Sequence, residues 1–443
     1  TGRTIDGQLL AIYSLDYDTI QGDNYGGNDY TYTETDLSSG TLNIMGNNDI
    51  YGIVGANVNV GGIYAGADNL DLINLNGTNV YFGNTVNANT VEINSGTNNT
   101  STNDYTFNGS ANVGNMNFNQ AASVLLNGGL TGNLNFNGYN SIVTIGSNQS
   151  IGGNVYTDGV NGTLIFQGSG NVNGQVVTTA DSSIKEVRAN GVGNVLFNST
   201  TQAEVDHVNY QAAALIGFNG GLDVTVDEST DAINQVTFNN HDGVLQINNG
   251  NLTGIEGEAV VTTTSNNKGT VTMVSGTQTI TGNIGSNGHA LKKLNIGGDN
   301  TGGLDTSTYN SSITTVNGDI YAQNTVLNND ITPNNSELLM EEGYDLYSTV
   351  TTSDSNMGVL KLLGGEQIVT GNVGTTSSRL AQVDSGANGA VSNFGSSSTP
   401  TDVYAVTVNN TGTGTTNFSH NVEATTINVG SGISNFTNDI VAT

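Results

Sequence analysis

The sequence predicts an all-β fold, a parallel β-solenoid whose coils of about 20 residues stack on one another. Three observations lead to this prediction: a recurring Gly-Asn motif, short stretches of alternating apolar and polar residues, and a composition poor in helix formers. Gly occurs 61 times and Pro only twice in the 443 residues, while Val, Ile and Leu recur at short intervals. Gly, Asn, Thr and Val are weak helix formers, whereas β-branched residues favour strands.

The net charge of the chain argues against two classes of binding partner. The chain has 8 basic and 38 acidic residues and a formal net charge of −30. This field repels nucleic-acid phosphates and anionic membrane surfaces, so we expect neither as a partner. There is no Cys and no apolar stretch long enough for a membrane-spanning helix. The chain begins at Thr1 without a signal peptide, as expected of a processed fragment of an exported bacterial protein.

A five-residue motif, apolar–x–Gly–Asn/Gln–apolar, carries the repeat. It occurs at 130–134, 151–155 and 172–176, spaced by 21 residues each time, and again at 316–320 with Asp in the polar position. Such a short, steady spacing favours one coil of a solenoid over a series of hairpins. The structural positions that define the motif are Gly132, Asn133, Gly153, Asn154, Gly174, Gly282, Asn283, Gly371 and Asn372.

Longer alignments extend the repeat over most of the chain. Residues 269–291 align without gaps to 358–380, and residues 82–91 align to 418–427. The hexapeptides at 114–119, 132–137 and 193–198 form a further set. One coil cannot bury its apolar side chains, so we expect stacked coils with parallel backbone pairing, inward asparagine ladders and Gly at the corners. The usual hand of parallel crossovers predicts a right-handed coil.

Two regions depart from the repeat and set the expected domains. Residues 1–40 are predicted to be a divergent N-terminal cap or assembly segment, followed by a solenoid over 41–327 and its continuation over 355–443. Residues 328–354 are predicted to be an insertion loop, in which 336–347 could form a short helix. The N-terminal segment holds the candidate assembly residues Tyr13, Tyr17, Tyr25, Tyr30 and Tyr32, and the candidate calcium ligands Asp16, Asp18, Asp23 and Asp29.

Catalytic motifs are not evident. The four histidines, His207, His241, His289 and His420, form no metal-binding spacing, and the sequence has no nucleophile elbow or phosphate-binding loop. Paired carboxylates on a β-helix could serve a carbohydrate-active enzyme, but the eight basic residues are scattered and there is no Trp for sugar stacking. We therefore expect a protein that is not an enzyme and has no cofactor other than possible calcium.

The repeats at 280–296 and 369–380 resemble the passenger region of the rickettsial surface cell antigens, the autotransporter family that contains the outer membrane protein B adhesins. The resemblance implies a β-solenoid at the bacterial cell surface that coats the cell and binds a host-cell receptor. A second hypothesis is an extracellular filament or surface layer in which copies assemble through their solenoid ends. A carbohydrate-active enzyme is the third.

Overall fold

The computed structural model describes residues 70–442 apart from 79, 84, 98–102, 179–181, 226–234, 307–309 and 329–334, together with six short strands before residue 70. The chain divides into two compact units, Thr1–Ser199 (unit 1) and Thr200–Thr443 (unit 2). The described residues contain no helix, and their strand pairings are parallel throughout. The predicted all-β parallel solenoid is therefore confirmed, with about 14 turns of roughly 23 residues.

The strands of unit 1 are β1 (Arg3–Ile5), β2 (Leu9–Leu10), β3 (Thr19–Ile20), β4 (Thr41–Ile44), β5 (Val58–Val60), β6 (Ile63–Tyr64), β7 (Leu70–Leu75), β8 (Val80–Phe82), β9 (Val86–Ile93), β10 (Tyr105–Phe107), β11 (Ala111–Phe118), β12 (Ser123–Leu126), β13 (Asn133–Asn135), β14 (Ile142–Ile145), β15 (Gln149–Ile151), β16 (Val155–Thr157), β17 (Val160–Phe166), β18 (Gly170–Val172), β19 (Val176–Thr178), β20 (Ser183–Ala189) and β21 (Asn194–Phe197).

The strands of unit 2 are β22 (Ala203–Tyr210), β23 (Leu215–Phe218), β24 (Leu222–Asp223), β25 (Gln235–Thr237), β26 (Val244–Ile247), β27 (Leu252–Thr253), β28 (Ala259–Thr262), β29 (Lys268–Met273), β30 (Gly276–Thr281), β31 (Asn283–Ile284), β32 (Leu291–Ile296), β33 (Ser312–Asn317), β34 (Ile320–Leu327), β35 (Glu337–Met340), β36 (Leu346–Thr352), β37 (Met357–Leu362), β38 (Glu366–Thr370), β39 (Leu380–Ser385), β40 (Val391–Phe394), β41 (Val403–Asn410), β42 (Thr415–Phe418), β43 (Val422–Val429), β44 (Ile433–Phe436) and β45 (Ile440–Ala442).

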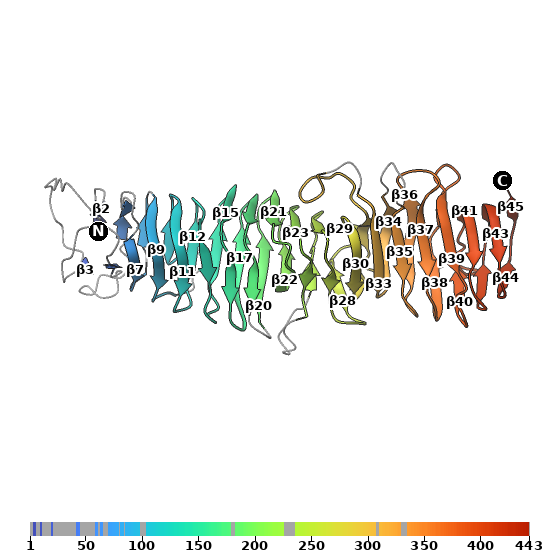
Figure 1. The fold of residues 1–443 in the computed structure, drawn as a ribbon, viewed down its shortest axis with the longest axis horizontal. Coiled ribbons are helices and arrows are strands. Elements are labelled where there is room, and N and C mark those ends of the chain that lie inside the picture. The colour runs from blue at the N-terminus through green and yellow to red at the C-terminus, as the bar shows by residue number, and fades with distance from the viewer. Residues whose placement is uncertain are drawn as a thin grey trace. The chain divides into compact units, whose positions relative to one another are not determined.

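Unit 1 contains three parallel ladders, and its strands lie side by side in Figure 1. Ladder A runs through β8, β10, β12, β14, β17 and β20. Ladder B continues from the first halves of β9 and β11 to β15, β18 and β21. Ladder C runs through β7, the second halves of β9 and β11, and then β13, β16 and β19. Each coil therefore contributes one strand segment to each of three faces.

Unit 2 also contains three ladders. Ladder D runs from the first half of β22 through β24, β27, β30, β33, β35, β37 and β39 to β41 and β43. Ladder E runs from the second half of β22 through β25, β28, β31, β34, β36, β38, β40 and β42 to β44. Ladder F runs from β23 through β26, β29, β32, β34 and β36, and after Val373 it reaches β41, β43 and β45.

The length of a coil varies more than the sequence predicts. The 21-residue spacing is found between β13 and β16, where Leu134 pairs with Val155, and between β16 and β19. Within unit 2 the step is as short as 18 residues, from Thr416 to Ser434, and as long as 36, from Thr279 to Thr315. Parallel pairing fixes the strands but not the loops that join them. The predicted period of 20 is therefore slightly shorter than the average.

The core follows the period-2 pattern of the strands. In β36, buried and half-buried residues alternate along the whole strand. Identical apolar residues often pair across coils: Phe82 stacks on Phe107 with ring centroids 4.6 Å apart, and Phe394 stacks on Phe418 at 5.1 Å. Offset aromatic pairs of this kind contribute about 0.5–1.5 kcal/mol each beyond burial. The inward side chains of neighbouring coils thus form continuous columns within each unit.

The corners use asparagine as well as glycine. Gly was predicted to supply positive φ, and Gly282 (φ 100°) and Gly371 (φ 95°) confirm this. In the part of the chain that the structure describes, eight asparagines also have positive φ, among them Asn239 and Asn267. Asn tolerates the left-handed region better than other non-Gly residues because its short amide can bond locally. The abundance of both residues in this sequence follows from this backbone requirement.

The predicted insertion loop at 328–354 is wrong for most of its length. Strands β35 and β36 occupy 337–340 and 346–352 and pair with neighbouring coils on both sides, so the region is part of the ladders. The suggested short helix at 336–347 is wrong for the same reason. Alternating burial in β35 identifies a strand, with Leu338 and Met340 in the core. Its acidic residues had hidden this alternation in the sequence.

Candidate interaction surface

The polar residue of the Gly-Asn motif bonds one coil to the next. In unit 1, Oδ1 of Asn133 accepts the backbone N–H of Asn154 at 2.8 Å, and Oδ1 of Asn154 accepts the N–H of Gln175 at the same distance. At the corner before ladder C the backbone leaves the regular pairing of the ladder. The side-chain oxygen there accepts the N–H that a backbone carbonyl would accept within the ladder. Asn133 and Asn154 are therefore structural residues, as the repeat predicted.

Unit 2 repeats the device with carboxylates. Asn283 accepts the N–H of Asp319 at 2.7 Å, and Asp319 in turn accepts the N–H of Asp345 at 2.8 Å. Asp345 accepts the N–H of Ile368 at 2.7 Å, which extends the chain of bonds over four coils. A separate corner joins Asn372 to the N–H of Asp402 at 3.0 Å. Charge-assisted acceptors of this kind are stronger than neutral ones.

The motif glycines are required by the close approach of neighbouring coils. A Cβ on Gly153 would lie 2.6 Å from the carbonyl carbon of Gly132, and one on Gly174 would lie 2.4 Å from that of Gly153. A Cβ on Gly371 would lie 2.8 Å from the carbonyl oxygen of Ser348. Such contacts are too short for any side chain, so these positions exclude every other residue at this coil spacing.

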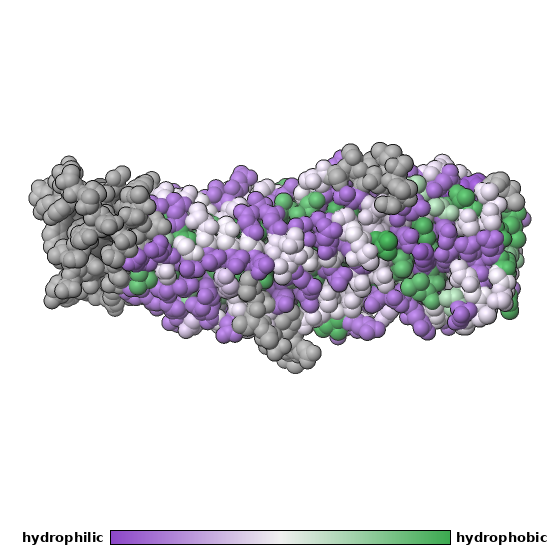
Figure 2. Space-filling model, in the orientation of Figure 1, coloured by the Kyte–Doolittle hydropathy of each residue, from purple (hydrophilic) through white to green (hydrophobic). Residues whose placement is uncertain are grey.

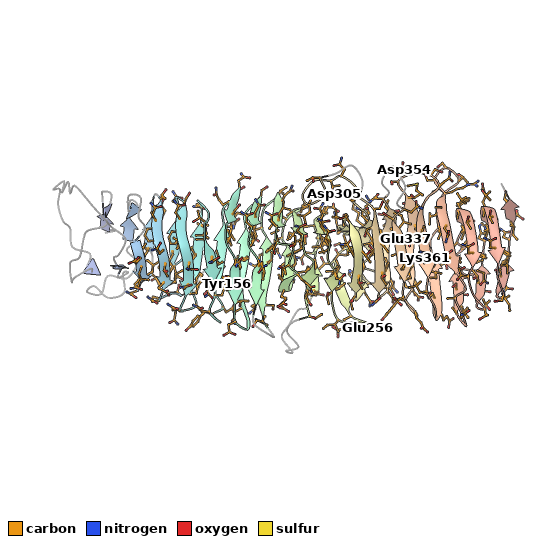
Figure 3. All side chains as sticks on the ribbon, in the orientation of Figure 1. Tyr156, Glu256, Asp305, Glu337, Asp354 and Lys361 are labelled. Carbon is orange, nitrogen blue, oxygen red and sulfur yellow. The ribbon has the colours of Figure 1, made fainter. Side chains whose placement is uncertain are left out.

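A tripeptide of Asn or Asp, then Val, Ile or Leu, then Tyr occurs six times in the sequence, and the sequence prediction missed this pattern. Four of the six lie entirely among the described residues; their tyrosines are Tyr156, Tyr321, Tyr347 and Tyr404. All four rings are half-buried on the outer face of a strand, and Figure 3 labels Tyr156 in unit 1. The repeated tripeptide was the available signal, because alternation places both polar groups on the same outer face.

In unit 2 two of these tyrosines form a surface with their carboxylates, which we call the Tyr-Asp stripe: Asp319, Tyr321, Asp345 and Tyr347. The rings of Tyr321 and Tyr347 stack with centroids 4.6 Å apart. The Tyr347 hydroxyl donates to Asp345 Oδ2 at 2.7 Å. Burial, followed by the Asp345 hydrogen bond, raises the pKa of Tyr347, and burial with the nearby Asp319 charge raises the pKa of Tyr321. The stripe is thus a neutral aromatic patch edged by negative charge.

Asparagine ladders cover other parts of the outer faces. Asn417 donates to Asn393 at 2.8 Å and Asn435 donates to Asn417 at 2.7 Å, beside the stacked phenylalanines of β40, β42 and β44. In unit 1 Asn133 donates to Asn115 at 3.0 Å. These side chains are half-buried or exposed, so the expectation that ladder asparagines point inward is wrong. Most of the buried positions carry apolar residues instead, because buried amides need every donor and acceptor satisfied.

The last coil of unit 2 exposes apolar residues at positions that earlier coils bury. Val403 and Val422 are fully buried, but their ladder partner Ile440 is 50% exposed. Ile433 is 57% exposed and Val429 49%. Figure 2 shows hydrophobic residues gathered at the end that carries β43–β45. We call this surface, made by β43, β44 and β45, the last-coil edge.

The histidines remain dispersed. His207 is buried and its Nε2 lies 3.1 Å from the Thr237 hydroxyl, while Nδ1 of His420 lies 2.5 Å from Asp402 Oδ1. Among the residues described, no group of three or more His, Asp or Glu side chains is placed to hold a metal ion. The tyrosines and aspartates predicted at the N-terminus lie outside the described residues. Their assembly and calcium roles remain predictions.

Comparison with known proteins gives no relative: no family model, no curated protein and no solved structure matches this chain. The resemblance to rickettsial passenger regions therefore remains a prediction. Within the described part of the chain, no helical segment has the length and apolar character of a membrane span.

Proposed function

We propose that the protein is a non-catalytic structural protein of the bacterial cell exterior, which coats the surface and adheres through its outer faces. The strongest support is that polar side chains hold neighbouring coils together in both units. The polar residues of the repeat, such as Asn133 and Asp319, accept backbone N–H groups of the next coil. This arrangement suits a rigid scaffold that presents the same polar pattern many times.

The Tyr-Asp stripe is the part of this scaffold best suited to adhesion. Stacked tyrosines offer a large contact area at a low cost in side-chain entropy, and the flanking carboxylates accept hydrogen bonds from a polar ligand. The net charge of −30 favours a receptor surface with basic or hydroxyl groups over an anionic membrane.

Adhesion is tested with purified protein on host cells. We expect the double substitution Tyr321→Ser, Tyr347→Ser to lower the amount bound at least fivefold, because it removes the stacked rings. The matched control is Tyr156→Ser, which removes a half-buried tyrosine from unit 1 beside Asn154 rather than a carboxylate. Immunogold labelling of intact cells checks the location. Equal binding by all three proteins, or hydrolysis of a polysaccharide by the wild type, would contradict the proposal.

The last-coil edge favours a second candidate function, assembly of copies into a filament or layer. The backbone edges of β44 and β45 continue ladders whose previous coils pair in register, and the exposed Ile440 continues the apolar column of Val403 and Val422. We propose a second copy of this chain as the occupant, paired as a further parallel coil. Its large negative charge would make the association stronger at high salt.

Assembly is tested by light scattering and electron microscopy of the 443-residue chain at low and moderate salt. Oligomers that grow with salt and vanish in the variant Ile433→Asp, Ile440→Asp support a second copy at this edge. The control Ile313→Asp changes an apolar residue that is 39% exposed on β33, away from the edge. A wild-type chain that stays monomeric at every salt concentration rejects assembly while leaving the adhesion proposal intact.

A further inference from the structure

One loop of unit 2 folds back over the outside of earlier coils. It joins β32 to β33, and its described residues at 297–306 return toward ladder F. Gln246 of β26 holds it, donating to the carbonyl of Gly302 at 2.8 Å and accepting the N–H of Leu304 at 2.8 Å. The loop covers outward-facing positions, so Gln246, Thr272 and Asn295 are all completely buried. Figure 3 marks its place by the label on Asp305.

Under this loop three acceptor oxygens have no hydrogen-bond donor. They are Oδ1 of Asn295, Oδ1 of Asp299 and Oδ1 of Asp305, and each is buried. Asn295 and Asp305 are 0% exposed. A buried acceptor without a partner costs about 1–3 kcal/mol, and more when it is charged. One of these oxygens lies on β32 and two lie in the loop, and together they indicate that a group which the protein itself does not supply belongs beside them.

Contacts of their other atoms bring these three side chains near one another. The Asn295 amide donates to Asp299 Oδ2 at 2.8 Å, which brings those two groups together. The carboxylate of Asp305 accepts the N–H of Asn300 at 2.6 Å and lies against Gly298. A Cβ on Gly298 would be 2.4 Å from Asp305 Oδ1, so glycine is required for the carboxylate to approach. The neighbouring residue along the chain is Asp299.

We propose that Asn295, Asp299 and Asp305 form a calcium site that ties this loop to ladder F. Carboxylate and amide oxygens are the ligands that Ca²⁺ prefers, and backbone carbonyls and water can complete its six to eight ligands. Mg²⁺ fits less well, because it requires near-octahedral geometry and loses water reluctantly. The protein's net charge of −30 raises the local concentration of divalent cations.

Lys293 is the group that competes with the ion. Its Nζ lies 3.2 Å from Asp299 Oδ2 and the side chain is 32% exposed, so it can turn toward solvent when a cation enters. A positive charge beside the site weakens cation binding through Coulomb repulsion. Replacing Lys293 with an uncharged residue of similar length should therefore strengthen binding, an effect that a purely structural loop would not show.

The experiment titrates chelator-treated wild-type protein with CaCl₂ by calorimetry, with MgCl₂ as the comparator at equal ionic strength. We expect Asp305→Asn to take up one Ca²⁺ fewer than the wild type and Lys293→Met to bind that ion about tenfold more tightly, which corresponds to ~1.4 kcal/mol. The matched control is Asp354→Asn, an exposed carboxylate of the same unit. It should leave the uptake unchanged.

Comparing the number of ions separates this site from other acidic parts of the chain. Equal uptake by the wild type and Asp305→Asn overturns the proposal, and so does an unchanged affinity in Lys293→Met. If Asp305→Asn does not fold, the Lys293→Met titration still decides, since that variant retains every proposed ligand. Binding of Mg²⁺ as tight as that of Ca²⁺ would also reject the assignment.

Discussion

Buried glutamines show how single residues secure a coil. Gln278 and Gln367 occupy the same position in the two aligned repeats, and both are almost completely buried. Gln278 donates to the carbonyls of Ile247 and Gly250, and Gln367 donates to that of Glu341 at 2.8 Å. Each amide donates to carbonyls at a corner of the previous coil and so adds a side-chain bond between the two coils.

Replacing Gln367 with Leu should lower the free energy of unfolding by about 2–4 kcal/mol, because the N–H of buried Gly364 loses its acceptor and the Glu341 carbonyl loses its shorter hydrogen bond. Urea denaturation followed by circular dichroism measures the change. The matched control is Gln382→Leu, since Gln382 is half-buried and donates only to Asp384. A loss of the same size in both variants would contradict the role given to the buried amide.

Tyr210 provides a pH test at the residue scale. It is fully buried, its hydroxyl donates to the Val244 carbonyl at 2.8 Å, and burial raises its pKa well above the usual 10.0. The folded state keeps the proton that the unfolded state loses above pH 10. The hydroxyl's contribution to stability is therefore complete below pH 10 and decreases as the pH rises above it.

In Tyr210→Phe this alkaline loss should disappear. The variant should be less stable than the wild type by about 1–2 kcal/mol at pH 8, because the Val244 carbonyl loses its donor. The difference should shrink by about 1.4 kcal/mol per pH unit above pH 10. Unfolding free energies at pH 8 and pH 11 check this. A difference that stays constant with pH would mean that Tyr210 does not titrate differently in the two states.

At the scale of elements, the phenylalanine column of ladder E tests how coils support one another. Phe418 stacks on Phe394 at 5.1 Å and on Phe436 at 5.0 Å. Phe418→Ala removes both contacts and should cost about 3–5 kcal/mol. Phe436→Ala, on the half-buried ring of the last coil, should cost clearly less. Thermal unfolding of both variants makes the comparison, and equal losses would argue against a column that depends on its middle ring.

The sequence predicted the strands better than it predicted which ladder each strand joins. The aligned repeats have matching glycine conformations, with φ 77° and 78° at Gly269 and Gly358 and φ 70° and 73° at Gly285 and Gly374. Yet β29 belongs to ladder F and β37 to ladder D, so the second copy lies one ladder further round the coil. Apolar alternation fixes the buried side of a strand, but it is the same on all three faces and cannot select among them.

Sequence patterns predicted some residues of the candidate sites and missed others. The polar position of the motif was visible because Asn133 and Asn154 recur at a fixed spacing. The oxygens of Asn295, Asp299 and Asp305 were not, because only the folded loop shows that they are buried and lack donors. These groups are buried because the loop between β32 and β33 covers them. The alternation of apolar and polar residues in the strands does not predict the path of that loop.

At the scale of the whole chain, charge is the dominant variable. The 38 acidic residues greatly outnumber the 8 basic ones, so self-repulsion opposes folding at low ionic strength. Raising NaCl from 10 to 150 mM shortens the Debye length from about 30 to about 8 Å. With a calcium chelator present throughout, the urea midpoint should rise over this range. A midpoint that falls would mean that ion pairs such as Lys361–Glu337, at 2.5 Å, matter more than repulsion.

The unequal length of successive coils has a consequence for how such a chain can change. Pairing in register survives whether the intervening connection is short, as between β42 and β44, or long, as between β30 and β33. New residues can therefore be inserted at the connections without changing how the strands pair. Gly288, at a connection where an added Cβ would meet nothing within 4 Å, marks one place where evolution or an engineer has room to do so.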